Sequence, residues 1–339
     1  MTCSLVGRVH AFYYLWYGNP DQDGRWVHWN HDVLPHWDPV VRARYPTNGT
    51  SFLPPDEIHA PFYPLLGPYS SRDPAILDTH FGWMEDIDTV VLSWTGRESV
   101  SDTQGVSTDE AFPAAIAAAK KNGLSVALHL EPYPGRSARS VRSDLEYLLS
   151  SYDFGECKVV AYVYDAYHVR ATEWKDLFCR GGAFTVRGTA WDVVALATFL
   201  TPSDRDLLTT GCFDGVYTYF ATDGFTYGSS RRNWPRVVEM AHALGKIVSL
   251  SAGPGYNDTK IRPWNARATR ARDGGRLFKR ALVDAFELAD VVSITSFNEW
   301  GEGTQIEPAI SRESYLDYGP NPRLYLDVLK ETRREADLL

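Results

Sequence analysis

The chain has 339 residues, and its 34 basic and 43 acidic side chains give a net charge of -9. Because it has no basic run and no interleaved basic and aromatic patch, we do not expect nucleic acid as a partner. Aromatic residues make up 13% of the sequence, which suits the stacking of sugar faces as well as core packing. No apolar run approaches the ~18 residues of a membrane span, and residues 2–9 do not resemble a signal peptide. We therefore expect no membrane contact from this chain. If the protein enters the secretory pathway, we expect its targeting segment to be missing from this sequence.

Eight apolar runs rich in β-branched and aromatic residues predict buried strands. They cover residues 9–17, 89–94, 125–133, 159–166, 192–199, 215–221, 247–253 and 291–297. Strands that alternate with helical patterns predict a parallel sheet, and eight such units predict a (β/α)8 TIM barrel, here one catalytic domain over residues 1–339. An open doubly wound sheet is the alternative. It would normally carry a Gly-rich phosphate loop after the first strand, and residues 14–20 contain none.

Helix signals follow the strands. Asp73 and Pro74 supply an N-cap and a proline at the first helical position of a helix that runs toward residue 87. A second helix runs from residue 108 or 109 to residue 121 and ends at an Asn-Gly pair. Further helices are predicted at 139–151, 172–179, 203–209, 229–244, 275–288 and 322–337. The stretch 18–72 is rich in Pro, Trp, His and Asp, and we expect this long loop after the first strand to form an ordered wall of the active site.

Two glutamates three residues apart, Glu299 and Glu302, follow the last predicted strand and lie on either side of Trp300. The glycines around them require a turn, so both carboxyls should emerge at the C-terminal end of the strand, where α/β barrels hold their catalytic groups. Two carboxyls beside an aromatic ring are typical equipment for cleaving a glycosidic bond. The structural alternative, which is the commoner reading of an isolated E-x-x-E, is a pair of salt-bridged loop glutamates.

Polar and aromatic residues also stand at the ends of the other predicted strands. They are Tyr13, Tyr14, Trp16, Tyr17, Trp94, His129, Glu131, Asp165, Tyr217, Tyr219, Tyr256, Arg262 and Asn298. Each has an ordinary explanation, since strand-end tyrosines often border the core and His129 could satisfy a backbone carbonyl. Because all strand ends of a barrel meet at one mouth, the set together indicates a carbohydrate cleft.

Two other classes of function compete with a glycosidase. A metal hydrolase would need a His/Asp cluster, and His10, His28, His31 and His36 form a candidate, but their Trp neighbours indicate sugar-facing or packing residues. A lectin-like module would need the aromatics without the acids. The four cysteines have no zinc-binding spacing and leave one or two disulfides open, so we expect neither metal nor cofactor. Of the two N-glycosylation sequons, we favour use of Asn48 over Asn257.

The sequence resembles glycoside hydrolase family 99, the endo-α-1,2-mannosidases and endomannanases. The similar segments, among them FYYLWYGNP and HWNH, are 12–20, 28–31, 36–39, 69–74, 131–133, 213–215, 217–221, 253–256, 261–265 and 298–307. They extend over essentially the whole chain. The resemblance implies a (β/α)8 barrel that cleaves an internal α-1,2-mannosyl bond with retention and without a metal. It also implies a location in the Golgi lumen or secretory pathway.

The resemblance further implies roles for the two acids. Glu299 would take a proton from the substrate's own 2-hydroxyl, which then forms a 1,2-anhydro sugar, while Glu302 would protonate the departing oxygen and later activate water. The implied substrate is a glucosylated high-mannose N-glycan, with release of a glucosyl-α-1,3-mannose type disaccharide. Activity on mannan and non-catalytic glycan binding are the alternatives. The implied substrate-binding residues are Tyr14, Trp94, His129, Glu131, Tyr217, Tyr219, Tyr256, Arg262 and Asn298.

Overall fold

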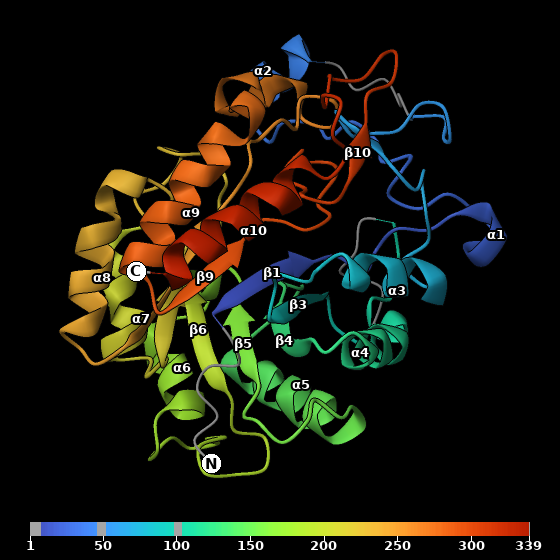
Figure 1. The fold of residues 1–339 in the computed structure, drawn as a ribbon. Helices are drawn as coiled ribbons and strands as arrows, with labels where there is room; N and C mark the ends of the chain where they lie inside the picture. Colours follow the sequence, from blue (N-terminus) through green and yellow to red (C-terminus); the bar gives the residue numbers. More distant parts are fainter. Residues whose placement is uncertain (1–7, 46–51, 98–103, 339) are drawn as a thin grey trace.

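The computed structural model describes residues 8–45, 52–97 and 104–338 (Figure 1). Eight parallel strands form a closed barrel in the order β1-β3-β4-β5-β6-β7-β8-β9, in which β1 pairs with both β3 and β9. The strands are β1 Val9–Tyr13, β3 Thr89–Trp94, β4 Ser125–Leu130, β5 Val160–Val163, β6 Val194–Thr198, β7 Gly215–Tyr217, β8 Ile247–Ala252 and β9 Val291–Ile294. The predicted (β/α)8 fold is confirmed.

The predicted strands begin close to the correct residues, but most of them extend too far. The first was predicted to residue 17, whereas β1 ends at Tyr13 because the backbone N–H of Tyr14 donates to the side chain of Asn298 at 2.7 Å. Apolar and aromatic residues continue past the ends of the ladders, since the mouth of the barrel is itself lined with rings. Hydrophobic pattern alone does not mark where pairing stops.

A helix follows each barrel strand on the outside (Figure 1). These helices are α3 Pro74–Gly82, α4 Phe112–Lys121, α5 Ala138–Ser151, α6 Ala171–Phe178, α7 Arg205–Thr209, α8 Trp234–His242, α9 Arg276–Leu288 and α10 Leu324–Asp337. The start of α3 is as predicted, because the Asp73 carboxylate accepts from the N–H of Ala75 at 2.8 Å. Its predicted end at residue 87 was five residues too late, and the chain leaves the helix at Trp83.

The segment from residue 18 to residue 72 is more structured than a long loop. It holds α1 Pro20–Asp23, α2 Pro39–Arg44 and β2 Tyr63–Pro64, and the last pairs antiparallel with β10 Ala309–Ile310. Both helices begin with a proline after a capping Asn or Asp. Backbone hydrogen bonds from Ser71 to Tyr17 and from His59 to Trp29, at 2.8 and 3.0 Å, fold this segment back over the barrel mouth.

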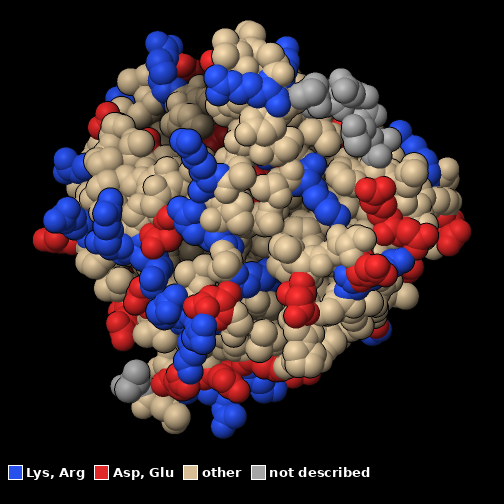
Figure 2. All heavy atoms as spheres, turned by 90° about the horizontal axis from the view of Figure 1, so that it is seen from above, with Lys and Arg blue, Asp and Glu red and all other residues tan. Residues whose placement is uncertain are grey.

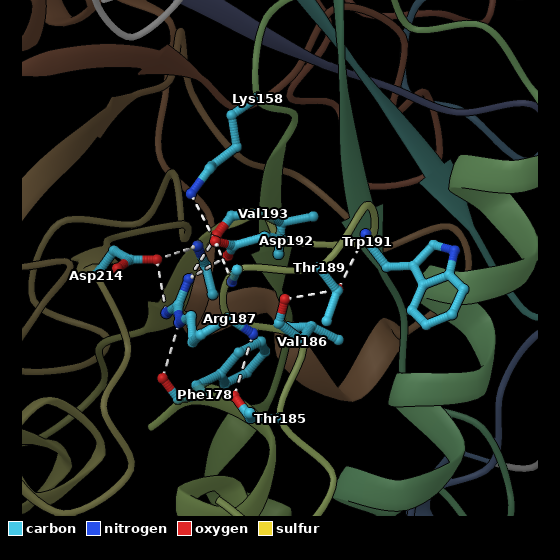
Figure 3. A network of polar contacts seen from close by, with 12 residues as sticks. Lys158, Phe178, Thr185, Val186, Arg187, Thr189, Trp191, Asp192, Val193 and Asp214 are labelled. Atoms are coloured by element: carbon cyan, nitrogen blue, oxygen red, sulfur yellow. Dashed lines mark hydrogen bonds and ion pairs between the residues drawn. The ribbon is translucent and has the colours of Figure 1, made fainter. Parts of the chain in front are cut away.

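Arg187 connects the segments that lead into β6 and β7 at the N-terminal end of the barrel (Figure 3). Its Nη1 donates to Asp192 at 3.0 Å and to the carbonyl of Val193 at 2.7 Å, and its Nη2 pairs with Asp214 at 2.8 Å. Nε donates to the carbonyl of Phe178 at 2.7 Å. The guanidinium therefore joins three stretches of chain at this end of the barrel: the end of α6, the residues just before β6 and the residue just before β7.

A disulfide lies beside this network. Cys179, at the end of α6, is bonded to Cys212, just before β7, at a sequence separation of 33 and a Cα–Cα distance of 5.2 Å. The carbonyl of Cys212 also accepts from Arg187 at 3.2 Å. Cys157 is in a disulfide as well. The base of the barrel is thus held by covalent links as well as by ion pairs.

The surface carries both signs of charge in close proximity. Figure 2 shows basic and acidic side chains next to one another over much of one face. Arg231 pairs with Asp284 at 2.6 Å, and Lys279 pairs with Glu335 at 2.8 Å. Among the helices of the described ranges, none is long and apolar enough to cross a membrane.

Candidate active site

A cavity of about 250 Å³ opens at the C-terminal ends of the barrel strands. Its lining residues are Trp16, His28, His31, Leu34, His59, Thr95, Glu131, Pro132, Ile261, Arg262, Glu299 and Glu302. Loops after β1, β3, β4, β8 and β9 supply them, so sequence positions almost 290 residues apart meet at one site. Larger hollows of about 520 and 750 Å³ lie at the opposite end, where Lys158 and Asp192 line both and form an ion pair at 2.8 Å.

The loop after β9 holds the two candidate catalytic acids. Its ends are tied together by a hydrogen bond from the N–H of Ser296 to the carbonyl of Thr304 at 2.9 Å, and the N–H of Glu299 donates to the Ser296 hydroxyl at 2.7 Å. The carbonyl of Glu302 accepts from the N–H of Asn257 at 2.8 Å, which joins this loop to the one after β8. Both carboxyls therefore project from a fixed backbone.

The environments of the two acids differ. Burial raises the pKa of Glu299 well above its ordinary value, and the like charge of Glu302 raises it further. Burial also raises the pKa of Glu302, but the nearby Arg262 guanidinium opposes this shift. Only 7% of Glu299 is exposed, whereas 23% of the Glu302 side chain is. Two neighbouring carboxyls with unlike surroundings can divide the roles of acid and base.

Arg262 lies between two carboxylates. Its Nη1 is 3.1 Å from Glu302 Oε1 and 3.1 Å from Asp258 Oδ2. The phenol of Tyr256 donates to the same Asp258 oxygen at 2.8 Å. Arg262 was predicted as a substrate-binding residue and lines the cavity, whereas Asp258 was missed because its triplet 257–259 was interpreted only as a glycosylation sequon.

Glu131 is oriented by two neighbours. Its Oε1 accepts from the Ser93 hydroxyl at 2.9 Å and lies 2.9 Å from Nδ1 of His129. The other ring nitrogen of His129 lies 3.1 Å from the hydroxyl of Tyr217. The tautomer of His129 decides which of these two groups donates the hydrogen bond. Of these predicted residues, Glu131 lines the cavity, while His129 and Tyr217 are buried behind it.

Aromatic rings form the wall next to these acids. Tyr14 stacks on Trp16 with ring centroids 4.4 Å apart, and Trp16 stacks on His28 at 5.0 Å. The hydroxyls of Tyr14 and Tyr219 are hydrogen-bonded to each other. Burial raises the pKa of both phenols, so they remain neutral hydroxyl groups near the carboxylates. The predicted convergence of strand-end aromatics at the mouth is present.

Of the nine predicted substrate-binding residues, seven are not among the residues that line the cavity, and Trp94 and Asn298 are two of these. Trp94 is buried, and its indole N–H donates to Asp109 at 2.8 Å, while the next residue, Thr95, lines the cavity. The side chain of Asn298 is fully buried and clamps the backbone of Tyr14, accepting from its N–H at 2.7 Å and donating to its carbonyl at 2.9 Å. Trp94 thus precedes a lining residue in the chain, and Asn298 fixes the backbone of Tyr14, whose ring stacks on the lining residue Trp16.

His59 is a cavity residue that the sequence did not reveal. Burial lowers its pKa well below the ordinary value, and the neighbouring His31 and His28 lower it further, so the imidazole is neutral near pH 7. It approaches the acids because Gly301 has no side chain. A Cβ there would lie 2.8 Å from His59 Nε2 and 3.2 Å from Glu299 Oε1.

The histidines considered as metal ligands are spread over three places. His10 lies inside the barrel beside Tyr162 at 2.8 Å, and His36 stacks on Trp37 with centroids 3.9 Å apart. His28 and His31 are neighbours in the cavity wall, with ring centroids 5.5 Å apart. Within the described ranges, no group of three or more His, Cys, Asp or Glu side chains is arranged to hold a metal ion.

The two sequons differ in what can be said of them. Asn48 lies outside the described residues. Asn257 lies beside the loop after β9, and its side-chain oxygen accepts from the hydroxyl of Thr259 at 2.7 Å. Use of either sequon stays a prediction.

Comparison with known proteins identifies the class of enzyme. The family model described as Glycosyl hydrolase family 99 matches residues 4–337. The chain belongs to glycosyl hydrolase family 99. It is 42% identical to the glycoprotein endo-alpha-1,2-mannosidase of Rattus norvegicus, over 95% of this chain and 73% of that protein. It is 41% identical to the glycoprotein endo-alpha-1,2-mannosidase-like protein of Homo sapiens, over 97% and 75% of the two chains.

The family 99 fold is shared with a solved bacterial enzyme. The GH99 endo-alpha-mannosidase from Bacteroides thetaiotaomicron superimposes with a TM-score of 0.88 at 36% identity, covering 98% of each chain. The resemblance stated from the sequence is therefore confirmed, and so is the enzyme class. This protein is a glycoside hydrolase of the endo-α-1,2-mannosidase family, and a glycan is its class of substrate.

Proposed function

We propose that this family 99 enzyme is a retaining endo-α-1,2-mannosidase that acts on glucosylated high-mannose N-glycans. It hydrolyses the internal α-1,2-mannosyl bond and releases a glucosyl-α-1,3-mannose type disaccharide. The observation that carries the proposal is that Glu299 and Glu302 line the same cavity in unlike surroundings, one almost fully buried and the other paired with Arg262. Membership of the family supports the bond that is cleaved.

In the proposed first step, the Glu299 carboxylate takes the proton of the substrate's 2-hydroxyl. That oxygen attacks C1 while Glu302 gives its proton to the departing glycosidic oxygen, which leaves as a neutral hydroxyl group. In an α-mannoside the 2-oxygen and the leaving group lie on opposite faces, so the attack can come from behind. The product on the enzyme is a 1,2-anhydro sugar, and no protein nucleophile is needed.

In the second step, ionised Glu302 takes a proton from water as the water oxygen bonds to C1. The C1–O2 bond of the anhydro sugar breaks, and its oxygen takes the proton that Glu299 carries. Both acids return to their first states. Two inversions at C1 retain the configuration, and each carboxyl acts once as acid and once as base.

The residues around the two acids have proposed binding roles. Glu131 and Arg262 line the cavity and can accept from or donate to sugar hydroxyls. We assign the other predicted binding residues to the same subsites, either by direct contact or through these two. They are Tyr14, Trp94, His129, Tyr217, Tyr219, Tyr256 and Asn298.

The test is incubation with a glucosylated high-mannose glycan and with a yeast-type mannan side by side, with and without a chelator. We expect disaccharide release from the glycan, unaffected by the chelator. Release of single mannose units only would contradict the endo mode. Preferential cutting of mannan would favour the endomannanase alternative, and glycan binding without any product would favour a non-catalytic protein.

We also propose a location in the Golgi lumen or secretory pathway. The disulfide between Cys179 and Cys212 supports it, because disulfides persist in oxidising compartments. Localisation of the tagged native protein in its own cells is the measurement, and a cytosolic signal would contradict it.

A further inference from the structure

Asp258 is a buried carboxylate that the proposed mechanism does not use. It follows β8 and has no exposed surface. Its Oδ2 accepts from three donors: the phenol of Tyr256 at 2.8 Å, Nη1 of Arg262 at 3.1 Å and the amide of Asn265 at 2.9 Å. Its Oδ1 is buried and has no hydrogen-bond partner among the described residues. The side chain is therefore held by three hydrogen bonds, and Arg262 is the one cation among these three donors.

The same guanidinium nitrogen is shared with the proposed acid. Arg262 Nη1 lies 3.1 Å from Asp258 Oδ2 and 3.1 Å from Glu302 Oε1, so one cation stands between two carboxyls. Because Arg262 is four residues after Asp258, the backbone turn of this loop fixes the pair. A displaced Arg262 could form its ion pair with Glu302 alone.

A lone arginine beside Glu302 would oppose its function. An opposite charge within ~4 Å favours the ionised form of a carboxyl, and an ionised carboxyl has no proton to give. With Asp258 present, the three groups are neutral in sum when Glu302 is protonated. Without Asp258, they are neutral only when Glu302 is ionised. The buried aspartate therefore changes which protonation state of the acid is electrically balanced.

We propose that Asp258 is a positioning residue that holds Arg262 in place and balances its charge, so that Glu302 can carry a proton to the departing sugar oxygen. This inference rests on the role of Glu302 in the proposed function. It adds a third member, by way of Arg262, to the pair of acids in the loop after β9.

Other groups also act on Glu302, and they come from every side of the mouth. The titratable and charged groups that face it are Glu299, Glu131, Asp258, Arg262, Tyr14, Tyr164, Tyr219 and Tyr256. Among the influences on the pKa of Glu302, burial raises it most, Arg262 lowers it next, and Asp258 raises it third. Neutralising Asp258 should therefore lower this pKa, as the geometry of the shared nitrogen requires.

The experiment is the pH dependence of kcat/KM for Asp258→Asn on the glycan and on a substrate with an acidic leaving group. Loss of the protonated acid limits kcat/KM at high pH, so this limb should move to lower pH by about one unit on the glycan. Activity on the glycan near pH 7 should fall ~10-fold, since each pKa unit changes the protonated fraction tenfold above the pKa. On the activated substrate, which needs little protonation, the loss should be much smaller.

Four further variants keep the test decisive. Asn265→Ala removes a donor to Asp258 without changing charge and should leave the high-pH limb in place. Asp258→Glu keeps the negative charge and should hold this limb close to its wild-type position. Arg262→Met should move the limb to higher pH, and the double variant Asp258→Asn/Arg262→Met should lie between the two single ones. This double variant keeps the inference testable if Asp258→Asn does not fold.

The outcomes separate this inference from the function beneath it. An unchanged limb in folded Asp258→Asn, with Glu302→Gln still rescued by the activated leaving group, would overturn the role of Asp258 alone. A basic limb that persists in Glu302→Gln on the activated substrate would show that Glu302 is not the acid. In that case both the assignment of Glu302 and the role of Asp258 fall.

Discussion

Two arginine ion-pair networks stand at opposite ends of this barrel and use their charge differently. At the base, the guanidinium of Arg187 is surrounded by Asp192, Asp214 and backbone carbonyls, and all three of its nitrogens donate to the protein (Figure 3). At the mouth, Arg262 lies between Asp258 and Glu302 and lines the cavity. The network around Arg187 uses its cation to hold chain segments together, whereas Arg262 stands beside Glu302, the carboxyl that we propose as the proton donor. Barrels generally separate stability and catalysis in this way.

The largest expected effect is at the mouth, on the pair of acids. Glu302→Gln should lose ~10²–10⁴ in kcat on a glycan, whose leaving group is a basic alkoxide, but should retain turnover on an activated leaving group. Glu299→Gln should fail on both, because the 2-hydroxyl must lose its proton whichever group departs. Rates on the two substrates are the measurement, with Glu313→Gln, an exposed glutamate, as the control. Equal recovery of both variants would sink the division of roles and direct attention to a pair that includes Glu131.

Substitutions in the Arg187 network, at the N-terminal end of the barrel, should change the stability of the fold and leave catalysis unchanged. Arg187→Met leaves Asp192 and Asp214 without their cation, and breaking such a pair in a mostly buried site lowers the free energy of unfolding by about 3 kcal/mol. The matched control is Lys158→Met, which removes the exposed partner of the same Asp192 and should change stability by less than about 1 kcal/mol. Denaturant unfolding measures both. A folded Arg187→Met enzyme with a large loss in kcat would contradict the separation of the two ends.

Glu131 tests whether a hydrogen-bonded mouth residue binds sugar or supports the fold. Glu131→Gln keeps an acceptor for Ser93 but removes the charge, and it should lower kcat/KM by ~10–100-fold through a weaker contact to substrate. Its Tm should stay nearly unchanged. Ser93→Ala, which removes only the hydroxyl, is the companion variant. If Tm falls strongly while the kinetics barely change, Glu131 has a structural role like that of Arg187 at the N-terminal end of the barrel.

The smallest expected effect is a stability gain at the mouth. Burial raises the pKa of Glu299 in the folded enzyme, so the wild-type protein loses stability as pH rises from the unfolded carboxyl pKa of about 4.3 through the folded value. Glu299→Gln does not ionise and should have a Tm higher than wild type by a few degrees at pH 8, with a difference that shrinks toward pH 4. Thermal unfolding across this range is the measurement. A Tm difference independent of pH would show that ionisation is not its cause.

The sequence predicted the barrel well because its strand signals are local. Runs such as 89–94 coincide with β3 Thr89–Trp94, and the capping pair Asp73 and Pro74 marks the start of α3. The ends of the strands were less predictable, since the aromatic residues of the mouth continue the hydrophobic pattern. The segment 18–72 was predicted as an ordered wall, and the two short helices and the strand β2 within it were not.

The site was most predictable where a residue follows a strand closely. Glu299 and Glu131 do, and both line the cavity as expected. Trp94 also stands at a strand end, but its ring turns inward to Asp109. Asp258 and His59 lie in long loops. The place of His59 depends on Gly301, 242 positions away along the chain, whereas Asp258 is joined through Arg262 to Glu302, 40 positions after that arginine. No local pattern carries such information.

Gly301 makes two distant positions share one volume. A side chain at 301 would enter the space now held by the imidazole of His59, which lies 2.8 Å from where its Cβ would be. The two positions are therefore coupled in the course of sequence change: a residue larger than glycine at 301 is compatible only with a smaller one at 59. Whether a substitution at position 301 is tolerated thus depends on the residue at position 59, and the reverse also holds, although 242 positions separate the two in the sequence.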